Sequence, residues 1–500
     1  MSVTLGQIAA RLARAGLLRE TPPAESGWDL LAVRTVSADS RRVTRGALFC
    51  AVAGTREDSH RYLVSAEEAG AVAAVVERRH PSFALPQLVV SDGRLAAAHA
   101  AAERFSDPWD ELTLVGVTGT NGKTTTAAIL HHLLGRRAPA ASIGTLGIVG
   151  ADGLVLPGTA GLTTPGPVQT AEWMRRLVDD GVRGVAMETS SHALHQGRVA
   201  AMRFDAAIFT NLSRDHLDYH ETFDAYRDAK LRLLDLLKPG GSAVLNVDDP
   251  VWREVAQRTR GALRFGTRAE AEIRAVDISP FPGGTEWELH TPDGATAVRL
   301  PLYGVYNVSN ALGAAAALWS IGWPREEITS GLASLPQVPG RLEHVPGPAG
   351  SPTVLIDYAH TPDALDRVLA AVRPLARERL IVVFGAGGDR DPGKRPEMGH
   401  VAARGADLVV VTSDNPRTED PERIIDDIER GMGDAPRLRI PDREEAIRRA
   451  LAEAGAEDLV LLAGKGHETY QIQGTEHRPF DERVVVRSIL EHGETAWPKA

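Results

Sequence analysis

One cysteine, Cys50, occurs in the 500 residues, which excludes an internal disulfide and fits a reducing compartment. The longest apolar stretches, such as residues 70–76 and 311–319, are far shorter than the roughly 20 residues that a membrane-spanning helix needs. The N-terminus has arginines spread through a helical pattern where a signal peptide would have a continuous apolar core. We therefore expect a cytoplasmic protein that does not enter a membrane.

Lysine is also scarce, because only six of the 56 basic residues are lysines. They are Lys123, Lys230, Lys238, Lys394, Lys465 and Lys499. Arginine is permanently charged, whereas lysine is a compact point charge that can lose its proton and react, so the position of each lysine bears on function. Four of them fall inside the motifs described below, and Lys238 and Lys499 look incidental. The net charge of −10 argues against a nucleic-acid-binding surface. Any anionic substrate must therefore be held by local arginines and backbone N–H groups.

The remaining composition is that of a globular enzyme, with 43% hydrophobic and 24% charged residues. Short Val/Ile/Leu runs alternate with helical stretches, which predicts α/β domains with largely parallel sheets. Breaks at residues 106–110 and at 336–352, where Pro and Gly fill eight of 17 positions, predict three domains. We place them at residues 1–108, 109–336 and 337–500.

Residues 118–125 lie between a predicted strand at 112–117 and a predicted helix at 124–134. Gly119 and Gly122 permit close approach of backbone N–H groups to a phosphate chain, and the helix N-terminus lies beneath it. Lys123 can reach the outer phosphates, and the Thr124 hydroxyl can reach Mg²⁺. The standard P-loop spacing would place glycine where the chain has Val117, so the loop is a variant. The alternative is a glycine-rich turn without function.

Polar residues follow the next two predicted strands, at 182–187 and 206–210. Glu188 is well placed to hold Mg²⁺, although it also fits an ordinary strand-ending turn. His216 stands beside two carboxylates, which favours a metal or phosphate role over that of a structural histidine. Lys230 lies in an apolar-periodic helix predicted over 223–237, where a lone lysine is usually solvated.

Together these segments resemble those of the Mur ligases, the ATP-dependent amide ligases that build the peptidoglycan stem peptide. Residues 119–125 resemble the signature that this family shares with the folylpolyglutamate synthetases. Residues 215–220 and 226–230 are similar to the segment that carries the family's carbamylated lysine. CO₂ adds only to a neutral amine, which lysine can present and arginine cannot. The resemblance therefore implies that Lys230 is modified rather than solvated.

The resemblance implies ATP, two Mg²⁺ ions and a CO₂-derived carbamate on Lys230. Lys123, Lys230 and His216 would be catalytic, and the metal ligands would be Thr124, Glu188, His216 and the Lys230 carbamate. Residues 304–311 resemble the family's adenine-side segment, and 340–343 and 357–362 its hinge and C-terminal motifs. The implied ATP contacts are Gly119, Thr120, Asn121, Gly122, Lys123, Thr124, Thr125, Asn307, Asn310, Arg341 and Asp357. From the residues alone, the two asparagines fit a helix start, and Asp357 fits a cap on the following helix.

Three loops of the last domain, at 387–395, 414–417 and 464–468, each follow a hydrophobic strand and should converge at the carboxyl edge of the sheet. The Asp-Asn-Pro-Arg sequence at 414–417 also fits a type I turn. In the Mur ligases it resembles the selector for diaminopimelate, whose extra carboxylate an arginine can grip bidentately. Glu468 would pair with the ammonium group. The implied pocket comprises Arg390, Asp414, Asn415, Pro416, Arg417, Gly464 and Glu468.

Residues 37–41 and 46–51 resemble the family's UDP-binding domain. The chain departs from the family pattern at 54–56, at Ser59 and at Leu162. The implied contacts of the UDP-muramoyl peptide are Ser40, Thr163, Thr164, Ser190, Gln196 and Arg198.

The resemblance thus implies three α/β domains: a smaller N-terminal one, a central P-loop-type ATPase domain with a mostly parallel sheet, and a Rossmann-like C-terminal one. The expected reaction is ATP-dependent addition of diaminopimelate to the D-Glu γ-carboxylate of UDP-N-acetylmuramoyl-L-Ala-D-Glu through an acyl phosphate. Its substrates are small molecules, and we expect a monomer. A folylpolyglutamate-type ligase, a lysine-adding ligase and a non-catalytic nucleotide switch are the alternatives.

Overall fold

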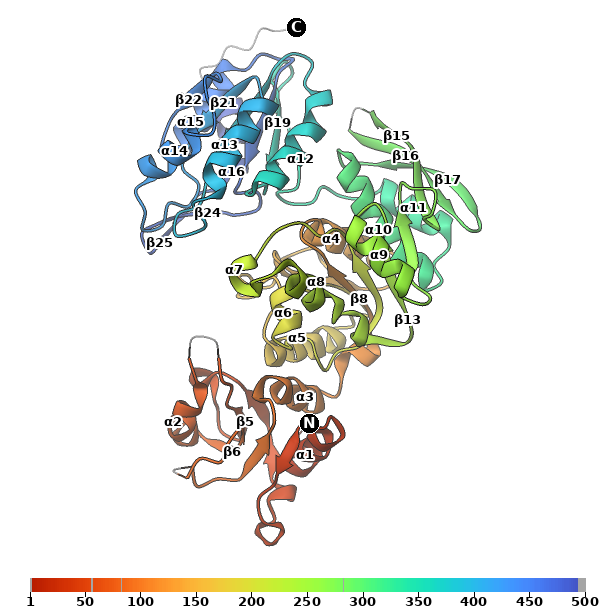
Figure 1. The fold of residues 1–500 in the computed structure, drawn as a ribbon, viewed down its shortest axis with the longest axis vertical. Helices are drawn as coiled ribbons and strands as arrows, with labels where there is room; N and C mark the ends of the chain where they lie inside the picture. The colour runs from red at the N-terminus through yellow and green to blue at the C-terminus, as the bar shows by residue number, and fades with distance from the viewer. Residues whose placement is uncertain (1, 55–56, 82, 282, 493–500) are drawn as a thin grey trace. The chain divides into compact units, whose positions relative to one another are not determined.

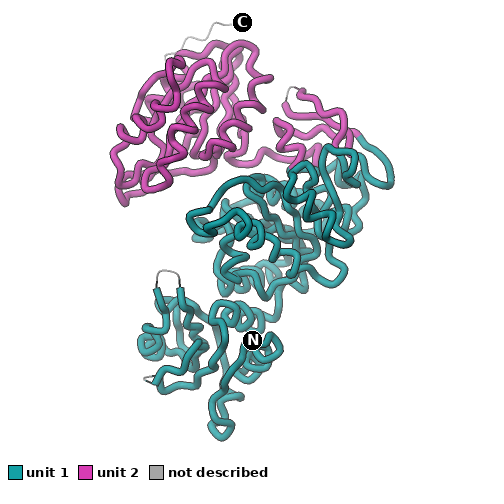
Figure 2. Tube along the Cα trace, in the orientation of Figure 1, with its two compact units in different colours: residues 1–274, 290–296, 310–331 teal, residues 275–289, 297–309, 332–500 magenta. Residues whose placement is uncertain are grey.

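The computed structural model describes residues 2–54, 57–81, 83–281 and 283–492 (Figure 1). Thr55, Arg56 and Lys499, which the sequence analysis singled out, lie outside these residues. The chain forms two compact units, coloured separately in Figure 2. The first comprises residues 1–274, 290–296 and 310–331, and the second comprises 275–289, 297–309 and 332–500. The three predicted domain boundaries stay predictions.

The N-terminal part of the first unit contains a five-stranded sheet in the order β2-β7-β6-β5-β4. Strands β4 to β7 run parallel, and β2 is antiparallel to β7. The bounds are β1 Val3–Thr4, β2 Leu18–Glu20, β3 Ala32–Val33, β4 Thr35–Ser37, β5 Ala47–Cys50, β6 Ala71–Val76 and β7 Gln87–Val90, with helices α1 Leu5–Arg14, α2 Leu63–Glu68 and α3 Gly93–Phe105.

Alternate residues of β5 enter two different cores, as the period of two along a strand requires. Leu48 and Cys50 pack with α1 and α3, whereas Ala47 and Phe49 pack with α2. Cys50 is fully buried, and this burial raises the pKa of its thiol to about 12.

The second sheet has the order β10-β9-β11-β8-β12-β13-β14-β15-β16-β17, and its pairs from β9 to β15 are parallel. The strands are β8 Thr113–Thr118, β9 Ala140–Gly144, β10 Gly147–Val149, β11 Gly184–Glu188, β12 Phe204–Phe209, β13 Leu237–Asn246, β14 Leu263–Gly266, β15 Ile273–Phe281, β16 Gly284–Thr291 and β17 Gly294–Leu300. The helices are α4 Lys123–Gly135, α5 Pro167–Asp179, α6 Ser191–His195, α7 Leu217–His220, α8 Phe223–Leu231, α9 Pro250–Arg258, α10 Val305–Ser320 and α11 Arg325–Ala333. The strand–loop–helix predicted around residues 118–125 is confirmed by β8 and α4.

The helix predicted over 223–237 was too long. It ends at Leu231, and β13 begins at Leu237. Pro239 disfavours helical backbone at Lys238, which helps to end the helix before that point. Lys238 also has a structural role that the sequence analysis missed, because its Nζ donates to the Leu112 carbonyl (3.1 Å) and to Asp205 Oδ2 (2.9 Å).

The third sheet belongs to the second unit and has the order β18-β19-β23-β20-β21-β22, parallel except for β18. The bounds are β18 Glu343–Val345, β19 Thr353–Asp357, β20 Leu380–Phe384, β21 Leu408–Val411, β22 Arg437–Arg439 and β23 Leu459–Ala463, and a separate hairpin comprises β24 Tyr470–Gln473 and β25 Glu476–Pro479. The helices are α12 Pro362–Val372, α13 Lys394–Gly405, α14 Pro421–Glu429, α15 Arg443–Glu453 and α16 Glu482–His492.

One core of the third sheet takes side chains from α12, α13 and α14, and the other takes them from α15 and α16. Helices thus cover both faces, as a parallel sheet requires. The linker predicted at 336–352 contains β18, which pairs with β19 through Glu343 and Val345. The predicted α/β class with mostly parallel sheets is confirmed.

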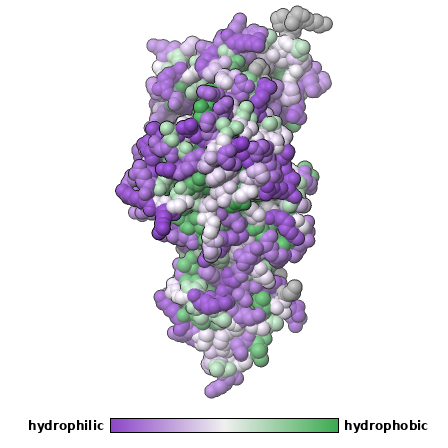
Figure 3. Space-filling model, turned by 90° about the vertical axis from the view of Figure 1, so that its right-hand side faces the viewer, coloured by the Kyte–Doolittle hydropathy of each residue, from purple (hydrophilic) through white to green (hydrophobic). Residues whose placement is uncertain are grey.

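The surface shown in Figure 3 mixes hydrophilic side chains with scattered hydrophobic ones. Of the exposed large hydrophobic side chains, Leu154, Val155 and Leu162 come from one loop after β10. Within the described ranges, no helix combines the length and the apolarity needed to cross a bilayer.

Candidate active site

Residues 119–122 form the turn between β8 and α4, and its backbone requires glycine at two positions. Gly119 has φ 152° and Gly122 has φ 86°. A Cβ at Gly119 would collide with Thr210 Oγ1, and a Cβ at Gly122 would collide with Asn310 Oδ1. Only glycine satisfies both constraints, so the backbone N–H groups ahead of α4 stay open to close approach by a phosphate.

The turn is fixed by the segment that follows the neighbouring strand β12. Thr210 Oγ1 donates to the Asn121 carbonyl (2.7 Å), and Asn211 exchanges two hydrogen bonds with the Asn121 backbone (2.9 and 3.0 Å). Ser213 N donates to Thr120 Oγ1 (3.0 Å). Sequence reasoning missed Thr210 and Asn211 as supporting residues, although their place directly after a strand of the same sheet was a usable signal.

Two lysine side chains meet at the carbonyl oxygen of Gly119. Lys123 Nζ donates to it (2.9 Å) and to the Thr120 carbonyl (2.7 Å), and Lys230 Nζ donates to it from α8 (2.8 Å). Lys230 is only 1% exposed, and its Nζ lies 4.5 Å from the centre of the Tyr226 ring. Burial, reinforced by the charge of Lys123, lowers the pKa of Lys230 well below its usual value, while Asp215 opposes the shift. Lys230 is therefore not a solvated surface lysine.

Glu188 ends β11 in register with Val117 of β8, which places it beside the phosphate turn. It is 1% exposed, and its carboxylate accepts hydrogen bonds from Thr145 N (2.8 Å) and Thr145 Oγ1 (3.1 Å). Thr145 is a further residue that sequence reasoning missed. These bonds orient the carboxylate, whose oxygens are suitable ligands for a cation.

His216 has a left-handed backbone (φ 53°), and its Nε2 lies 3.4 Å from Asp215 Oδ2. Burial lowers the pKa of His216, so its imidazole is available as a neutral ligand. In the part of the chain that the structure describes, no three His, Cys, Asp or Glu side chains gather in a way that could hold a metal ion. Among the predicted metal ligands, only Glu188 and His216 are of these residue types. The predicted site therefore also needs the Thr124 hydroxyl and a modified Lys230 as ligands.

Four of the predicted muramoyl-peptide contacts converge at the end of β11. Thr164 Oγ1 donates to the Glu188 carbonyl (2.8 Å) and accepts from Ser190 N (3.0 Å). Arg198 donates through Nη1 to the Thr164 carbonyl (2.8 Å) and through Nη2 to Gln196 Oε1 (2.7 Å). Thr164 thus links Arg198 to the backbone of Glu188, the predicted metal ligand.

Tyr219 joins this network, although sequence reasoning missed it. Its hydroxyl lies 3.0 Å from Gln196 Nε2 and 2.9 Å from His195 Nδ1. Thr163 is a neighbour of the same group, with its Oγ1 3.3 Å from Thr145 Oγ1. Ser40 lies farther away in the sequence, at the start of the 3-10 turn Ser40–Arg42 that follows β4.

The predicted ATP contacts outside the loop lie on several elements. Asn310 borders Gly122, whereas Asn307 donates from Nδ2 to the Tyr303 carbonyl (2.9 Å). Asp357 is the last residue of β19, and its carboxylate accepts hydrogen bonds from Leu342 N (2.9 Å) and Ala359 N (2.8 Å).

The side chain of Asp357 therefore fixes the turn that carries Arg341, whose guanidinium lies 4.8 Å from the centre of the Tyr358 ring. The alternative reading of Asp357 as a cap of α12 was wrong, because Thr361 occupies that position and accepts from Ala364 N.

The loops at 387–395, 414–417 and 464–468 converge in the second unit, as predicted for the carboxyl edge of the third sheet. Asn415 Nδ2 donates to Glu468 Oε2 (2.9 Å). Arg417 has φ 53° and donates from Nη1 to the Gly388 carbonyl (2.7 Å). A Cβ on Gly464 would lie 2.6 Å from Asp414 Oδ2.

Arg390 lies exposed on the first of these loops, next to Gly387. The edge thus collects arginine cations and carboxylate anions, a combination that suits an amino acid with an additional carboxylate.

Parallel α/β sheets with a glycine-dependent turn at a helix N-terminus define the class: a P-loop-type nucleotide-binding enzyme. Residues 117–318 match the Mur ligase middle domain, and residues 340–466 match the Mur ligase, glutamate ligase domain. The UDP-N-acetylmuramoyl-L-alanyl-D-glutamate–2,6-diaminopimelate ligase of Geobacillus thermodenitrificans is 44% identical over 461 residues, which cover 90% of this chain and 94% of the relative. The chain belongs to the Mur ligase family.

Solved structures agree with this assignment. A structure of a UDP-N-acetylmuramoyl-L-alanyl-D-glutamate–2,6-diaminopimelate ligase has a TM-score of 0.70 and 33% identity, and the match covers 98% of this chain and 99% of that one. Folylpolyglutamate synthase from Mycobacterium tuberculosis, complexed with ADP and AMPPCP, has a TM-score of 0.60 and 20% identity and covers only 74% of this chain. The second match shows a shared fold alone.

Proposed function

We propose that the chain catalyses the ATP-dependent addition of diaminopimelate to the D-glutamate γ-carboxylate of UDP-N-acetylmuramoyl-L-alanyl-D-glutamate. The observation that carries the proposal is the edge of the third sheet, where Arg417 and Glu468 offer opposite charges on converging loops. Diaminopimelate differs from lysine by one carboxylate, which an arginine can bind bidentately. The relatives named for this activity match along nearly the whole length of the chain and support the same substrate.

The chemistry requires activation, because a carboxylate is a poor electrophile. The γ-carboxylate oxygen attacks the terminal phosphorus of ATP, and the bond from that phosphorus to the ADP oxygen breaks. The amine nitrogen of diaminopimelate then attacks the acyl carbon, phosphate leaves with the electrons of the acyl C–O bond, and the nitrogen releases a proton. Lys123 and the backbone of the phosphate turn neutralise the charge that builds up on the phosphates.

The residues beside the turn suit Mg²⁺, which prefers oxygen ligands. Glu188 supplies a buried carboxylate held by Thr145, and Thr124 supplies a hydroxyl at the start of α4. Together with His216 and a Lys230 carbamate, they would hold two ions. Bound Mg²⁺ would offset the negative charge of the nucleotide and the acyl phosphate.

The Lys230 carbamate would form when the neutral amine nitrogen bonds to the carbon of CO₂ and releases a proton. The burial of Lys230 and the lowered pKa of its amine support this step. The product is a carboxylate on a long side chain, which replaces the neutral amine beside Gly119 with an anion that can bind metal.

Phosphate release tests the proposal. With ATP and UDP-muramoyl dipeptide present, we expect release to depend on added diaminopimelate and to be much weaker with L-lysine. Comparing the meso and LL isomers identifies the preferred one. Release that favours L-lysine would indicate a lysine-adding ligase, and release that is indifferent to the muramoyl dipeptide would indicate a nucleotide switch. Either result would contradict the proposal.

A further inference from the structure

Lys465 lies in the loop at 464–468, yet it is not among the proposed substrate contacts. Its side chain is 0% exposed. Its Nζ donates to Asn415 Oδ1 (3.1 Å) and to Glu468 Oε2 (3.1 Å). A fully buried ammonium group is stable only when charged and polar partners compensate it, and both partners here belong to the proposed diaminopimelate pocket.

The backbone around Lys465 is tightly constrained. Gly464 has φ 116° and Gly466 has φ 55°, and a Cβ on Gly466 would lie 2.7 Å from Tyr358 Cβ. Glu468 N donates to the Lys465 carbonyl (3.0 Å), which sets the spacing of the two side chains.

From the α15 side, buried Arg443 donates to the carbonyls of Ser413 (3.2 Å) and Ala463 (2.9 Å), the residues just ahead of the two loops. Lys465 is therefore held in one place by its own loop and by the sheet edge.

The bonds from Lys465 determine how its partners face a ligand. Asn415 Oδ1 accepts from both Lys465 Nζ and Ile472 N (2.9 Å), so the amide is oriented with Nδ2 toward Glu468. The bonds from Lys465 and Asn415 both end on Glu468 Oε2. Oε1 takes part in neither, on a side chain that is 15% exposed, and is the oxygen available to a ligand.

We propose that Lys465 is a positioning residue that fixes the Asn415 amide and the Glu468 carboxylate so that Glu468 Oε1 receives the ammonium group of the amino-acid substrate. The inference rests on the proposed function. A lysine suits this place because a compact ammonium fits between two acceptors, whereas the planar fork of arginine needs more space. This explains one of the few positions at which the chain uses lysine.

Steady-state kinetics of the full-length Lys465→Met variant test the proposal. We expect the KM for diaminopimelate to rise roughly tenfold or more, the scale of a lost charge-assisted hydrogen bond. The KM values for ATP and UDP-muramoyl dipeptide should change by less than about twofold. In a Glu468→Gln background, Lys465→Met should add little, because the two residues act as one unit. Should the methionine variant unfold, Lys465→Gln should show the same selective rise in the KM for diaminopimelate and the same small added effect in the Glu468→Gln background.

Arg379→Met is the matched control. Arg379 pairs with buried Asp458 (2.7 Å) at the start of β20 and β23, the end opposite to the one where Lys465 follows β23. This variant should leave the KM for diaminopimelate unchanged. A uniform rise of all three KM values in the Lys465 variant, or effects of Lys465→Met and Glu468→Gln that multiply, would overturn the proposal. Failure of the proposed function is distinguishable, because the unmodified enzyme would then show no diaminopimelate-dependent phosphate release.

Discussion

Lys123 and Lys230 donate to one carbonyl oxygen, that of Gly119. Two like charges that share one acceptor raise each other's free energy, and the buried partner gives up its proton more readily. The turn therefore favours a neutral, nucleophilic amine at Lys230, beside the Lys123 side chain that we propose binds phosphate. The same geometry accounts for two lysines in a chain that otherwise relies on arginine.

Carbamylation of Lys230 is expected to be detectable and functional. Enzyme equilibrated with ¹³C-bicarbonate should show a carbamate carbon signal that Lys230→Ala lacks. The alanine variant should lose activity by about a hundredfold or more, as when a group that stabilises transition-state charge is removed. Formate or acetate should partly restore it by replacing the missing carboxylate.

Lys238→Ala is the control for this experiment, because Lys238 is a structural lysine on β13. It should keep the carbamate signal and show no restoration by formate. An unmodified Lys230 together with no restoration would rule out the carbamate.

Arg417 should determine selection between amino acids. Arg417→Ala is expected to raise the KM for diaminopimelate roughly tenfold to hundredfold through loss of a charge-assisted contact, with the KM for ATP unchanged. The KM of Arg417→Lys for diaminopimelate should lie between those of the unmodified enzyme and Arg417→Ala, since lysine keeps the charge and loses the bidentate guanidinium. Arg404→Ala, at an exposed ion pair with Asp366, is the control. Unchanged diaminopimelate kinetics in Arg417→Ala would refute the assigned specificity.

Residue patterns located the groups of the site better than the contacts that hold them. Gly119 and Lys123 were predictable because their chemistry depends on local spacing. The burial of Lys230 was not, because helical periodicity alone places a lone lysine in solvent. Thr145 and Tyr219 were missed since their importance depends on contacts with Glu188 and Gln196, which lie far away in the sequence.

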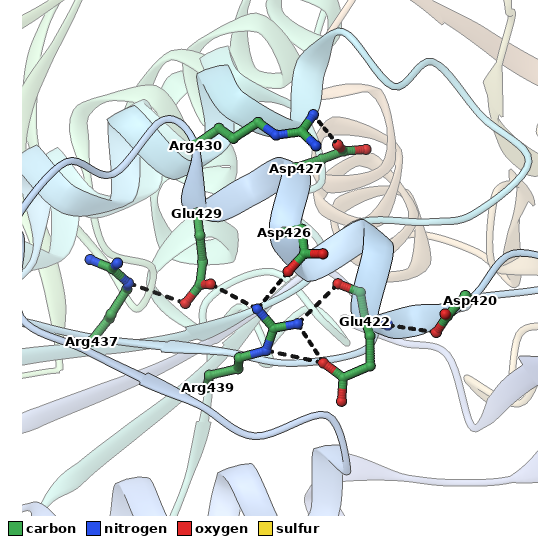
Figure 4. Close-up of polar contacts among 8 residues, drawn as sticks. All are labelled: Asp420, Glu422, Asp426, Asp427, Glu429, Arg430, Arg437 and Arg439. Carbon is green, nitrogen blue, oxygen red and sulfur yellow. Dashed lines mark hydrogen bonds and ion pairs between the residues drawn. The ribbon is translucent and has the colours of Figure 1, made fainter.

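At the scale of elements, Arg437 and Arg439 of the edge strand β22 both pair with carboxylates of α14, and Arg439 makes most of these contacts. Figure 4 shows the Arg439 guanidinium among the side chains of Glu422, Asp426 and Glu429. These carboxylates, led by Glu422, raise the pKa of Arg439. Arg439 thus compensates a strongly acidic helix and secures a short strand that pairs on one side only.

Replacing Arg439 should therefore destabilise the protein in a salt-dependent way. We expect Arg439→Met to lose roughly 1 kcal/mol of unfolding free energy at low ionic strength, the upper range for partly exposed ion pairs. The loss should shrink at about 1 M salt, where screening is strong. Urea unfolding measures both values. Arg449→Met, which removes a single exposed pair with Glu453, should cost less, and an equal, salt-independent cost for both would contradict this account.

Element boundaries were predictable where a strand runs directly into a turn, as at β8. The prediction failed where one element closely follows another, as between α8 and β13. The prediction over 223–237 extended α8 because apolar residues continue through the 3-10 turn at Leu234–Leu236. The strand that follows is fixed by Lys238 and Asp205, a contact between residues on different strands. Local periodicity does not contain that information.

At the scale of the whole molecule, His99 makes the free energy of unfolding depend on pH. It lies on α3, whose alanines share a core with Met174 and Leu177 of α5. Burial, followed by the charges of Arg11 and Arg203, lowers the pKa of His99 to about 4, and Asp107 opposes the shift. Between this value and the ordinary pKa, the unfolded chain binds a proton that the folded chain does not, so stability falls as pH falls.

The contribution of His99 can be isolated by urea unfolding at about pH 7.5 and about pH 5. The unmodified protein should lose roughly 1–2 kcal/mol through this residue, after allowance for solvent screening at a partly exposed side chain. His99→Gln should lose correspondingly less between the two pH values, whatever its absolute stability. An identical pH dependence in both proteins would exclude His99 as a contributor.

The burial of Cys50 makes the folded chain unreactive toward thiol reagents. Its thiol is inaccessible and remains protonated at neutral pH, so a maleimide dye has no native target in the folded protein. A cysteine introduced on the surface of either unit would be labelled alone, without removal of the native residue. Two such positions, one in each unit, would permit distance measurements by fluorescence transfer as nucleotide and amino acid bind.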